Sequence, residues 1–374
     1  MKFTISRYDL LKELNFLQGA IEKKSTIPIL QNIHIEANNN RLRLRATDLD
    51  IHALAIANAE VYSSGSACIP GKRLFDIIKA FPDAEIEIET TNGVAVIKCQ
   101  RSRFRLTTLD EVNYPEAPVV PTSMLPIDSS MIAKMIERVG FAATKEQSRY
   151  SLNGIKFELK SGKLRMVATD GHRLSFIEHD AYFEGGDFDQ ILPSKTLELV
   201  AKLATTAEKI FFGFNLGVSL NTVFFQADQR TIVSRFIAGQ FPDYNRVIEK
   251  HPLAITVKSN DLSAAFRRML LIANSIVPTV QVKFNQASLE VSAAASDVGE
   301  GGEEVFAEIP EIIQNQSIAL NANYVLNFLD ALGSSNQEES VVIQYKDDSS
   351  SILFRPQNNG NYDYLYIVMP IRKN

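Results

Sequence analysis

The feature that most constrains the fold of this chain is an internal repeat. Residues 42–48 read LRLRATD and residues 164–170 read LRMVATD, about 120 residues apart. Other pairs keep a similar offset: residues 69–74 with 192–197, and Tyr114-Pro115 with Phe241-Pro242. A weaker third copy begins near residue 254. A repeat of this size indicates one structural unit that occurs three times.

Three units divide the 374 residues into an N-terminal domain over 1–120, a central domain over 121–250 and a C-terminal domain over 251–374. Residues 115–126 are rich in proline and valine and predict the first linker. Residues 248–252 predict the second linker. Domains of this length are large enough to bury a core of their own.

Each unit shows the same pattern of elements, which predicts an α+β fold of about six helices, two per repeat, backed by antiparallel strands. Apolar residues recur at helical spacing in six segments, and period-two alternation predicts strands at 86–89, 104–107 and 341–345. Asp128 and Asn321 precede two of the helical segments as N-caps. The apolar stripes begin at Leu10, Leu74, Ile132, Leu197, Leu262 and Tyr324.

The polar faces of these helical segments carry many basic residues, whereas acidic clusters fall in apparent loops at 299–304, 338–339 and 347–348. Two interpretations remain open here. The faces are either ordinary solvated surface or a basic surface set against an acidic exterior. The net charge of −5 argues against a protein that grips nucleic acid over its whole surface, but it permits one that confines basic residues to one face.

Composition also predicts where the chain functions. It contains no apolar run long enough for a membrane span, and its N-terminus lacks the features of a signal peptide. Two cysteines, Cys68 and Cys99, cannot make a disulfide framework and have no histidine near them in sequence. We therefore expect buried thiols, no metal site and a cytoplasmic protein.

Two segments are candidates for chemistry or binding. Asp170 and His172, in the turn TDGHR, could serve a metal-dependent hydrolase, although no second histidine stands at ligand spacing. The segment 364–372 is an apolar run at the chain end, interrupted by Pro370. It predicts either a last core strand or the lip of a peptide groove in which methionine adapts to several partners.

Motifs along the whole chain resemble those of the bacterial sliding clamp family, the beta subunit of DNA polymerase III. The resemblance includes TIPIL at 26–30, TDLD at 47–50, RSRF at 101–104, RYSLNG at 149–154, VATDGHRL at 167–174, FPDY at 241–244 and VMPIR at 368–372. It implies a non-enzymatic processivity factor without cofactor or metal. Two chains would form a head-to-tail ring of six domains, with helices lining the hole and sheets forming the outer wall.

The resemblance also implies partners. These are encircled double-stranded DNA, bound without sequence preference, the polymerase III alpha subunit and other polymerases, the clamp loader, and mismatch-repair and ligase-type proteins. They would share a peptide pocket, in which apolar residues receive the peptide anchors and Arg173 and Arg246 bind polar atoms. By resemblance the pocket comprises Leu152, Thr169, Gly171, His172, Arg173, Leu174, Pro242, Arg246, Val247, Tyr324, Val368, Met369, Pro370 and Arg372.

Two further sets of residues follow from the same resemblance. The ring seam would join Phe104 and Leu106 of one chain to Leu271 and Ile272 of the other. The DNA-facing set combines the basic helix faces with two loop residues, and Lys24 takes the place of a family arginine. This set is Arg7, Lys12, Lys24, Arg73, Lys79, Lys134, Arg138, Tyr150, Lys195, Lys202 and Arg267.

Overall fold

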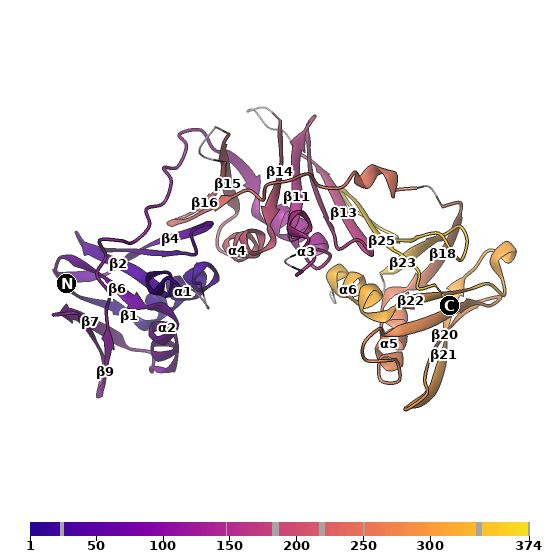
Figure 1. The fold of residues 1–374 in the computed structure, drawn as a ribbon, viewed down its shortest axis with the longest axis horizontal. Helices are drawn as coiled ribbons and strands as arrows, with labels where there is room; N and C mark the ends of the chain where they lie inside the picture. Colours follow the sequence, from indigo (N-terminus) through magenta and orange to yellow (C-terminus); the bar gives the residue numbers. More distant parts are fainter. Residues whose placement is uncertain are drawn as a thin grey trace. The chain divides into compact units, whose positions relative to one another are not determined.

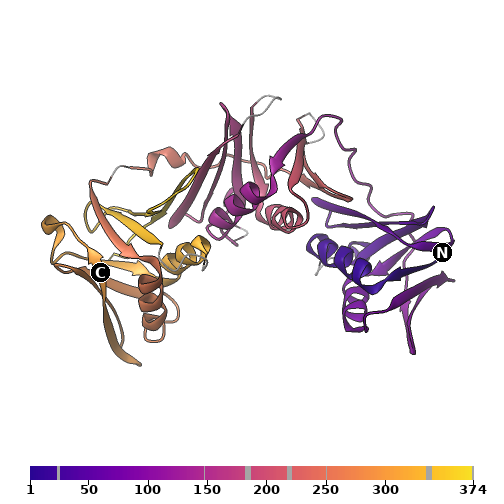
Figure 2. The same ribbon diagram turned by 180° about the vertical axis from the view of Figure 1, so that it is seen from behind.

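The computed structural model describes residues 1–22, 26–146, 148–181, 187–216, 221–249, 251–333 and 339–372 (Figures 1 and 2). Within these ranges the chain forms two compact units. The first unit joins Met1–Ala133 to Lys195–Phe236, and the second joins Lys134–Ser194 to Ile237–Asn374. Both units combine helices with antiparallel sheets, which confirms the predicted α+β class.

Six α-helices occur in the described part of the chain, at the six segments with helical spacing. The leucine, isoleucine and phenylalanine stripes that predicted them are largely buried. Within the first unit α1 contacts α2, and within the second unit α5 lies beside α6 (Figures 1 and 2). The helices are α1 (Arg7–Leu17), α2 (Gly71–Ala80), α3 (Ser129–Gly140), α4 (Ser194–Ala204), α5 (Ser259–Met269) and α6 (Ala322–Leu332).

Short polar side chains fix the starts of several helices. The Asn321 side chain accepts a hydrogen bond from the Asn323 amide at 3.0 Å, and Asp128 Oδ1 accepts one from the Met131 amide at 2.8 Å. Each oxygen satisfies one amide that has no partner within its helix. Both predicted caps are therefore confirmed.

The first unit contains two sheets. The smaller has the order β5 (Glu60–Ser63), β1 (Lys2–Ser6), β7 (Glu85–Thr91), β8 (Val94–Cys99) and β9 (Ser102–Thr107). The larger has the order β10 (Leu125–Asp128), β15 (Lys209–Asn215), β16 (Thr222–Ala227), β17 (Arg230–Arg235), β4 (Ile51–Asn58), β3 (Arg41–Thr47), β2 (Asn32–Asn38) and β6 (Gly65–Pro70). Because β17 pairs with β4, one sheet continues from the first repeat into the second.

The second unit is built on one continuous sheet, in which β13 and β25 lie side by side (Figure 1). This pair joins the second repeat to the third, as β17 and β4 join the first two. The order is β14 (Phe188–Pro193), β11 (Gly154–Lys160), β12 (Lys163–Thr169), β13 (Arg173–Asp180), β25 (Tyr362–Val368), β24 (Ile352–Pro356), β23 (Ser340–Tyr345), β18 (Leu253–Lys258), β21 (Gly299–Glu308), β20 (Ser288–Ala295), β19 (Thr279–Phe284) and β22 (Ser317–Asn321).

One prediction about the acidic clusters was wrong. Residues 299–304 are not a loop but the first part of β21, paired antiparallel with β20 along its length. Three glycines within a run of glutamates hide the strand pattern, whereas in the sheet the glutamates stand at the surface and Val305 is buried. Asp347 and Asp348 do lie outside the strands, and Glu338 lies outside the described residues.

Both cysteines are free and buried, as expected. Burial raises the pKa of the Cys68 thiol to about 12, so this thiol stays protonated and unreactive at neutral pH. Among the described residues, no helix combines the length and apolar character that crossing a membrane requires.

Candidate functional site: a turn and a tail at the end of the second unit's sheet

Two segments far apart in sequence meet where β13 pairs with β25. Arg173 stands opposite Val368 in the strand register, and the Met369 amide donates to the His172 carbonyl at 2.9 Å. The tail then continues to Ile371, whose amide donates to the Ala319 carbonyl at 2.8 Å. The structure thus brings the 169–174 turn beside the 368–372 tail.

The turn between β12 and β13 is held by its own polar side chains. Asp170 Oδ1 accepts from the amides of His172 and Arg173 at 2.9 and 3.1 Å. The Thr169 hydroxyl donates to the Arg173 carbonyl at 2.6 Å and accepts from the Gly171 amide at 3.1 Å. Gly171 has φ +89°, a conformation that side chains disfavour, so glycine is needed at this point of the turn.

The Arg173 side chain bonds to three groups of the protein itself. Its Nε donates to Asp170 at 2.9 Å, Nη1 to Asn327 Oδ1 at 2.7 Å and Nη2 to the Phe141 carbonyl at 2.7 Å. The guanidinium also lies 4.5 Å from the ring centroid of Tyr324. This side chain ties the turn to α6, so the predicted binding of polar peptide atoms by Arg173 stays a prediction and would require it to exchange one of these partners.

The floor beside the turn is apolar. It is a buried cluster on the sheet face, against which Phe241 and Ile248 of the following connector, residues 237–249, pack. Leu174 belongs to this floor, while Met369 and Val247 are 45% and 43% exposed at its edges. Leu152 and Tyr324 are half-buried, and Pro242 and Pro370 are partly accessible. The buried cluster is Val167, Leu174, Phe176, Tyr244, Leu353, Leu365 and Ile367.

Three polar members of the predicted set are accessible. His172 lies exposed on the turn and Arg372 on the tail. Arg246 lies in the one-turn 3-10 helix Tyr244–Arg246, where its Nε donates to Asp243 at 3.0 Å while most of the side chain stays in solvent. These groups border the apolar floor, so the arrangement suits a ligand with apolar anchors and a polar backbone.

The geometry gives no support to the hydrolase alternative. The Asp170 carboxylate accepts from two backbone amides and Arg173, and in the described structure it makes no hydrogen bond to the His172 ring. Among the described residues, no group of three or more His, Cys, Asp and Glu side chains could hold a metal ion. Asp170 therefore shapes a turn, a role that sequence alone cannot separate from catalysis.

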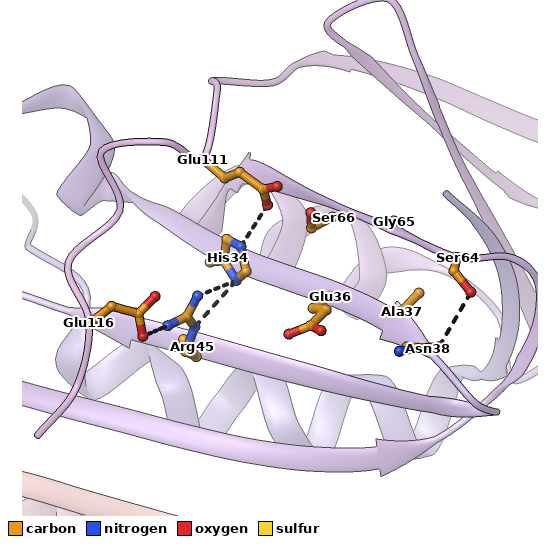
Figure 3. A pocket seen from close by; sticks show the side chains of 10 residues that line it. All are labelled: His34, Glu36, Ala37, Asn38, Arg45, Ser64, Gly65, Ser66, Glu111 and Glu116. Atoms are coloured by element: carbon orange, nitrogen blue, oxygen red, sulfur yellow. Dashed lines mark hydrogen bonds and ion pairs between the residues drawn. The ribbon is translucent and has the colours of Figure 1, made fainter. Parts of the chain in front are cut away.

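A polar cleft of about 360 Å³ lies in the first unit, where residues 109–116 cross the sheet (Figure 3). His34 Nε2 lies 2.9 Å from Glu111, and Arg45 donates to His34 Nδ1 and, at 2.6 Å, to Glu116. Since arginine only donates, Nδ1 must accept and Nε2 must donate to Glu111. These bonds satisfy one another, and through Glu111 and Glu116 they fasten residues 109–116 to the sheet.

The residues predicted to face DNA differ in how free they are. Lys12, Arg73, Lys79, Lys134 and Lys202 are exposed on their helices, and Tyr150 is exposed on its loop. Three others are engaged: Arg7 donates to the Ile78 and Lys79 carbonyls, Lys195 pairs with Asp48, and Arg267 pairs with Asp330. Lys24 lies outside the described residues.

Arg138 is the clearest departure from that set. It is 7% exposed, and its guanidinium carbon lies 4.8 Å from the ring centroid of Tyr364. Helical spacing placed Arg138 on the polar face, but the aromatic ring of β25 covers it, which argues against contact with phosphate.

The residues predicted for the ring seam are apolar and accessible. Phe104 is 44% exposed on β9, an edge strand, and Leu106 of the same strand is half-buried. Leu271, just after α5, is 79% exposed, and Ile272 is half-buried beside it. Each pair is of the kind that a partner surface could cover.

Comparison with known proteins places this architecture among three-domain clamps. Family models for the N-terminal, central and C-terminal domains of the DNA polymerase III beta subunit match residues 1–118, 126–243 and 246–372. The beta sliding clamps of Pseudomonas aeruginosa and Chlamydia muridarum are 31% and 28% identical to this chain, covering all of it and 100% and 99% of their own lengths.

Solved structures agree over the full length. A P. aeruginosa sliding clamp bound to griselimycin matches with a TM-score of 0.88 at 30% identity, and the Thermotoga maritima beta subunit matches with 0.90 at 26% identity; both matches cover 100% of each chain. The chain belongs to the DNA polymerase III beta subunit family, the beta sliding clamps. Its function is that of this family, a non-catalytic processivity factor of DNA polymerase III.

The structure adds residues that the predicted site lacked. Tyr244, Phe241 and Ile248 form or cover the floor, and Leu365 and Ile367 contribute to it from β25. The signal for Tyr244 was present, since the FPDY motif at 241–244 contains it. The two β25 residues carried no separate signal, because their apolar character also fits an ordinary core strand.

Proposed function

We propose that two copies of this chain close head to tail into a ring around double-stranded DNA and slide along it in the cytoplasm. The ring would tether the polymerase through a peptide groove that residues 169–174 and 368–372 form, called the groove below. The three domains would span 1–120, 121–250 and 251–374. The groove carries the proposal, because Met369 and Val247 are exposed beside a buried apolar floor. Such an edge receives the apolar side chains of a short linear peptide.

The groove would bind peptides from the polymerase III alpha subunit, other polymerases, the clamp loader, and mismatch-repair and ligase-type proteins. Leu174 would meet the anchors from below and Met369 from the side, while Arg246 and Arg372 bind polar atoms at the rim. The thioether of Met369 adapts to different anchors, which suits a groove with several partners.

Encirclement explains how a chain with a net charge of −5 acts on DNA. A closed ring stays on the duplex by topology, so a few weak phosphate contacts suffice. We assign these contacts to the exposed cations Lys12, Arg73, Lys79, Lys134 and Lys202, with Tyr150 and Lys24 from loops. Arg7, Lys195 and Arg267 would contribute after exchanging a protein partner for phosphate.

Retention on DNA tests this proposal. Protein loaded by a clamp loader should stay on nicked circular DNA and leave when the circle is cut, and its native mass should be twice 41.7 kDa. In parallel, fluorescence anisotropy should show a labelled peptide with a Gln-x-x-Leu-x-Phe motif binding to the unmodified chain. Equal retention on circular and linear DNA would rule out the ring, and a peptide that does not bind would rule out the groove.

A further inference from the structure

A ladder of charged side chains crosses three neighbouring strands of the second unit. Glu158 of β11 stands opposite Arg165 of β12, which stands opposite Glu178 of β13. Arg165 Nη1 donates to Glu158 at 3.1 Å and Nε donates to Glu178 at 2.8 Å. Lys163 also pairs with Glu178. By strand alternation these residues share a sheet face with Val167, Leu174 and Phe176 of the groove floor.

Tyr244 connects this ladder to the groove. Its hydroxyl donates to Glu158 at 2.7 Å and lies 3.3 Å from Arg165 Nη1, which donates to it. Its ring belongs to the apolar floor, with the Phe176 ring centroid 5.9 Å away. Burial first, and the neighbouring Glu158 carboxylate next, raise the pKa of Tyr244, so the group remains a neutral donor at physiological pH.

The backbone at Tyr244 carries a wall of the groove. Tyr244 begins the 3-10 helix, the Val247 amide donates to the Tyr244 carbonyl at 3.2 Å, and the Arg246 amide donates to the Asp243 carbonyl at 3.4 Å. Arg246 and Val247 themselves project into solvent. The Tyr244 hydroxyl is therefore a buried polar tether that fixes this short helix against the sheet.

We propose that Glu158, Arg165 and the Tyr244 hydroxyl are positioning residues for the peptide groove, holding the connector that carries Arg246 and Val247 in its binding geometry before a peptide arrives. This inference rests on the proposed peptide-binding function. If the segment that carries Arg246 and Val247 is ordered before binding, the entropic cost of ordering it does not reduce the affinity for the peptide. Affinity then rises without any new contact. A hydrogen bond to a charged acceptor is strong enough to hold such a wall.

Tyr244→Phe tests the tether, because it keeps the ring and removes only the hydroxyl. We expect peptide affinity to fall about tenfold, the order of one hydrogen bond to a charged group. Amide hydrogen exchange should quicken at residues 243–248, since these amides lose their anchorage. The matched control is Arg355→Gln, which breaks the Arg355–Asp363 pair of 2.7 Å on the same sheet and leaves Glu158, Arg165 and Tyr244 intact. It should leave both readouts unchanged.

Two variants at Glu158 separate positioning from general stability. Glu158→Gln keeps an oxygen that accepts from Tyr244 and should retain most of the affinity, whereas Glu158→Ala should behave like Tyr244→Phe. Unchanged exchange at 243–248 in Tyr244→Phe would overturn the inference even if no peptide binds, so its failure is distinct from failure of the proposed function. Faster exchange with unchanged peptide affinity would also overturn it, because the tether would then have no role in binding.

Discussion

At the scale of single residues, Arg173 is the most constrained side chain at the groove, because its three donor positions serve three acceptors on different elements. Arg173→Lys keeps the charge but cannot reach all three, so partly buried acceptors lose their donor at about 1–3 kcal/mol each. We expect a loss of about 2 kcal/mol in the free energy of unfolding, measured by urea denaturation. Arg246→Lys, on an exposed side chain, is the control and should cost little.

Three histidines with restricted access to solvent make stability depend on pH: His34 and His251 are buried and His52 is half-buried. Burial lowers the pKa of His34, His52 and His251, and both ring nitrogens of His251 lack a hydrogen-bond partner among the described residues. A histidine whose folded-state pKa is lowered binds its proton more readily when unfolded. Its contribution to stability is therefore complete above the unfolded pKa of about 6.5 and is lost as pH falls below it.

We accordingly expect the free energy of unfolding to fall between pH 7.5 and pH 5.5, by about 1.4 kcal/mol for each pKa unit of difference between the two states. Carboxylates with lowered pKa, such as Glu111 and Glu178, act in the same direction but at lower pH. His251→Phe should flatten the dependence, because it removes one of the histidines whose pKa burial lowers. A free energy that rises toward pH 5.5 would contradict this assignment.

At the scale of elements, the tail after β25 can be removed with little loss of core. Beyond Val368, which is buried, Met369 is exposed and the residues to Arg372 are at least partly accessible. Deleting residues 369–374 should leave a folded dimer whose peptide binding is weaker by about 2 kcal/mol or more, in the range of hot-spot losses. Anisotropy measures the affinity, and native mass with circular dichroism shows whether the dimer stays folded. Unchanged affinity would remove the tail from the groove.

The elements themselves were predictable because local patterns dictate them. Helical spacing from Leu10 and from Ile132, together with caps such as Asn321, requires only neighbours along the chain. What the sequence could not reveal depended on distant partners. Arg138 is covered by Tyr364, more than two hundred positions away, and Arg173 is bound by Asn327. No local pattern reveals that a strand of another repeat will cover a polar face.

The threefold repeat does not by itself reproduce the groove in every copy, because different side chains occupy equivalent positions. At the repeat offset, Val167 and Leu174 of the floor correspond to Arg45 and His52 of the first repeat. Arg45 instead binds Glu116 and stacks against Tyr114. The same backbone pairing thus supports an apolar floor in the second repeat and a set of polar bonds to residues 109–116 in the first. Only comparison of the aligned residues distinguishes the two.

At the scale of the whole molecule, exposed helix cations should govern loading onto DNA. Replacing Lys12, Arg73 and Lys202 together by glutamate should slow loading and flatten its salt dependence, because phosphate contacts release counterions. DNA sequence preference should not change, since contacts to phosphate carry no sequence information. Peptide affinity should stay within about twofold, because none of the three residues belongs to the groove. Filter binding at several salt concentrations measures association with DNA, and fluorescence anisotropy measures peptide affinity. A parallel fall in peptide binding would show that the two surfaces are not separate.

The ring seam is the last feature to test, because it decides whether the chain encircles anything. Leu271 is 79% exposed and Ile272 is half-buried beside it, so both present apolar surface that a partner could cover. Covering an apolar side chain stabilises an interface by about 1.5–3 kcal/mol, and a charge placed there adds a desolvation cost. Leu271→Ala with Ile272→Ala, or Ile272→Asp alone, should therefore yield folded monomers.

Sedimentation at sub-micromolar concentration measures the mass, and thermal unfolding shows whether the monomers keep their fold. Ile276→Ala is the matched control, an exposed apolar residue in the same segment that was not predicted for the seam. The monomers should still bind peptide with unchanged affinity, since the groove lies within one chain, yet they should be lost from circular DNA. A variant that remains dimeric would place the seam elsewhere. Monomers retained on circular DNA would show that retention does not require a closed ring.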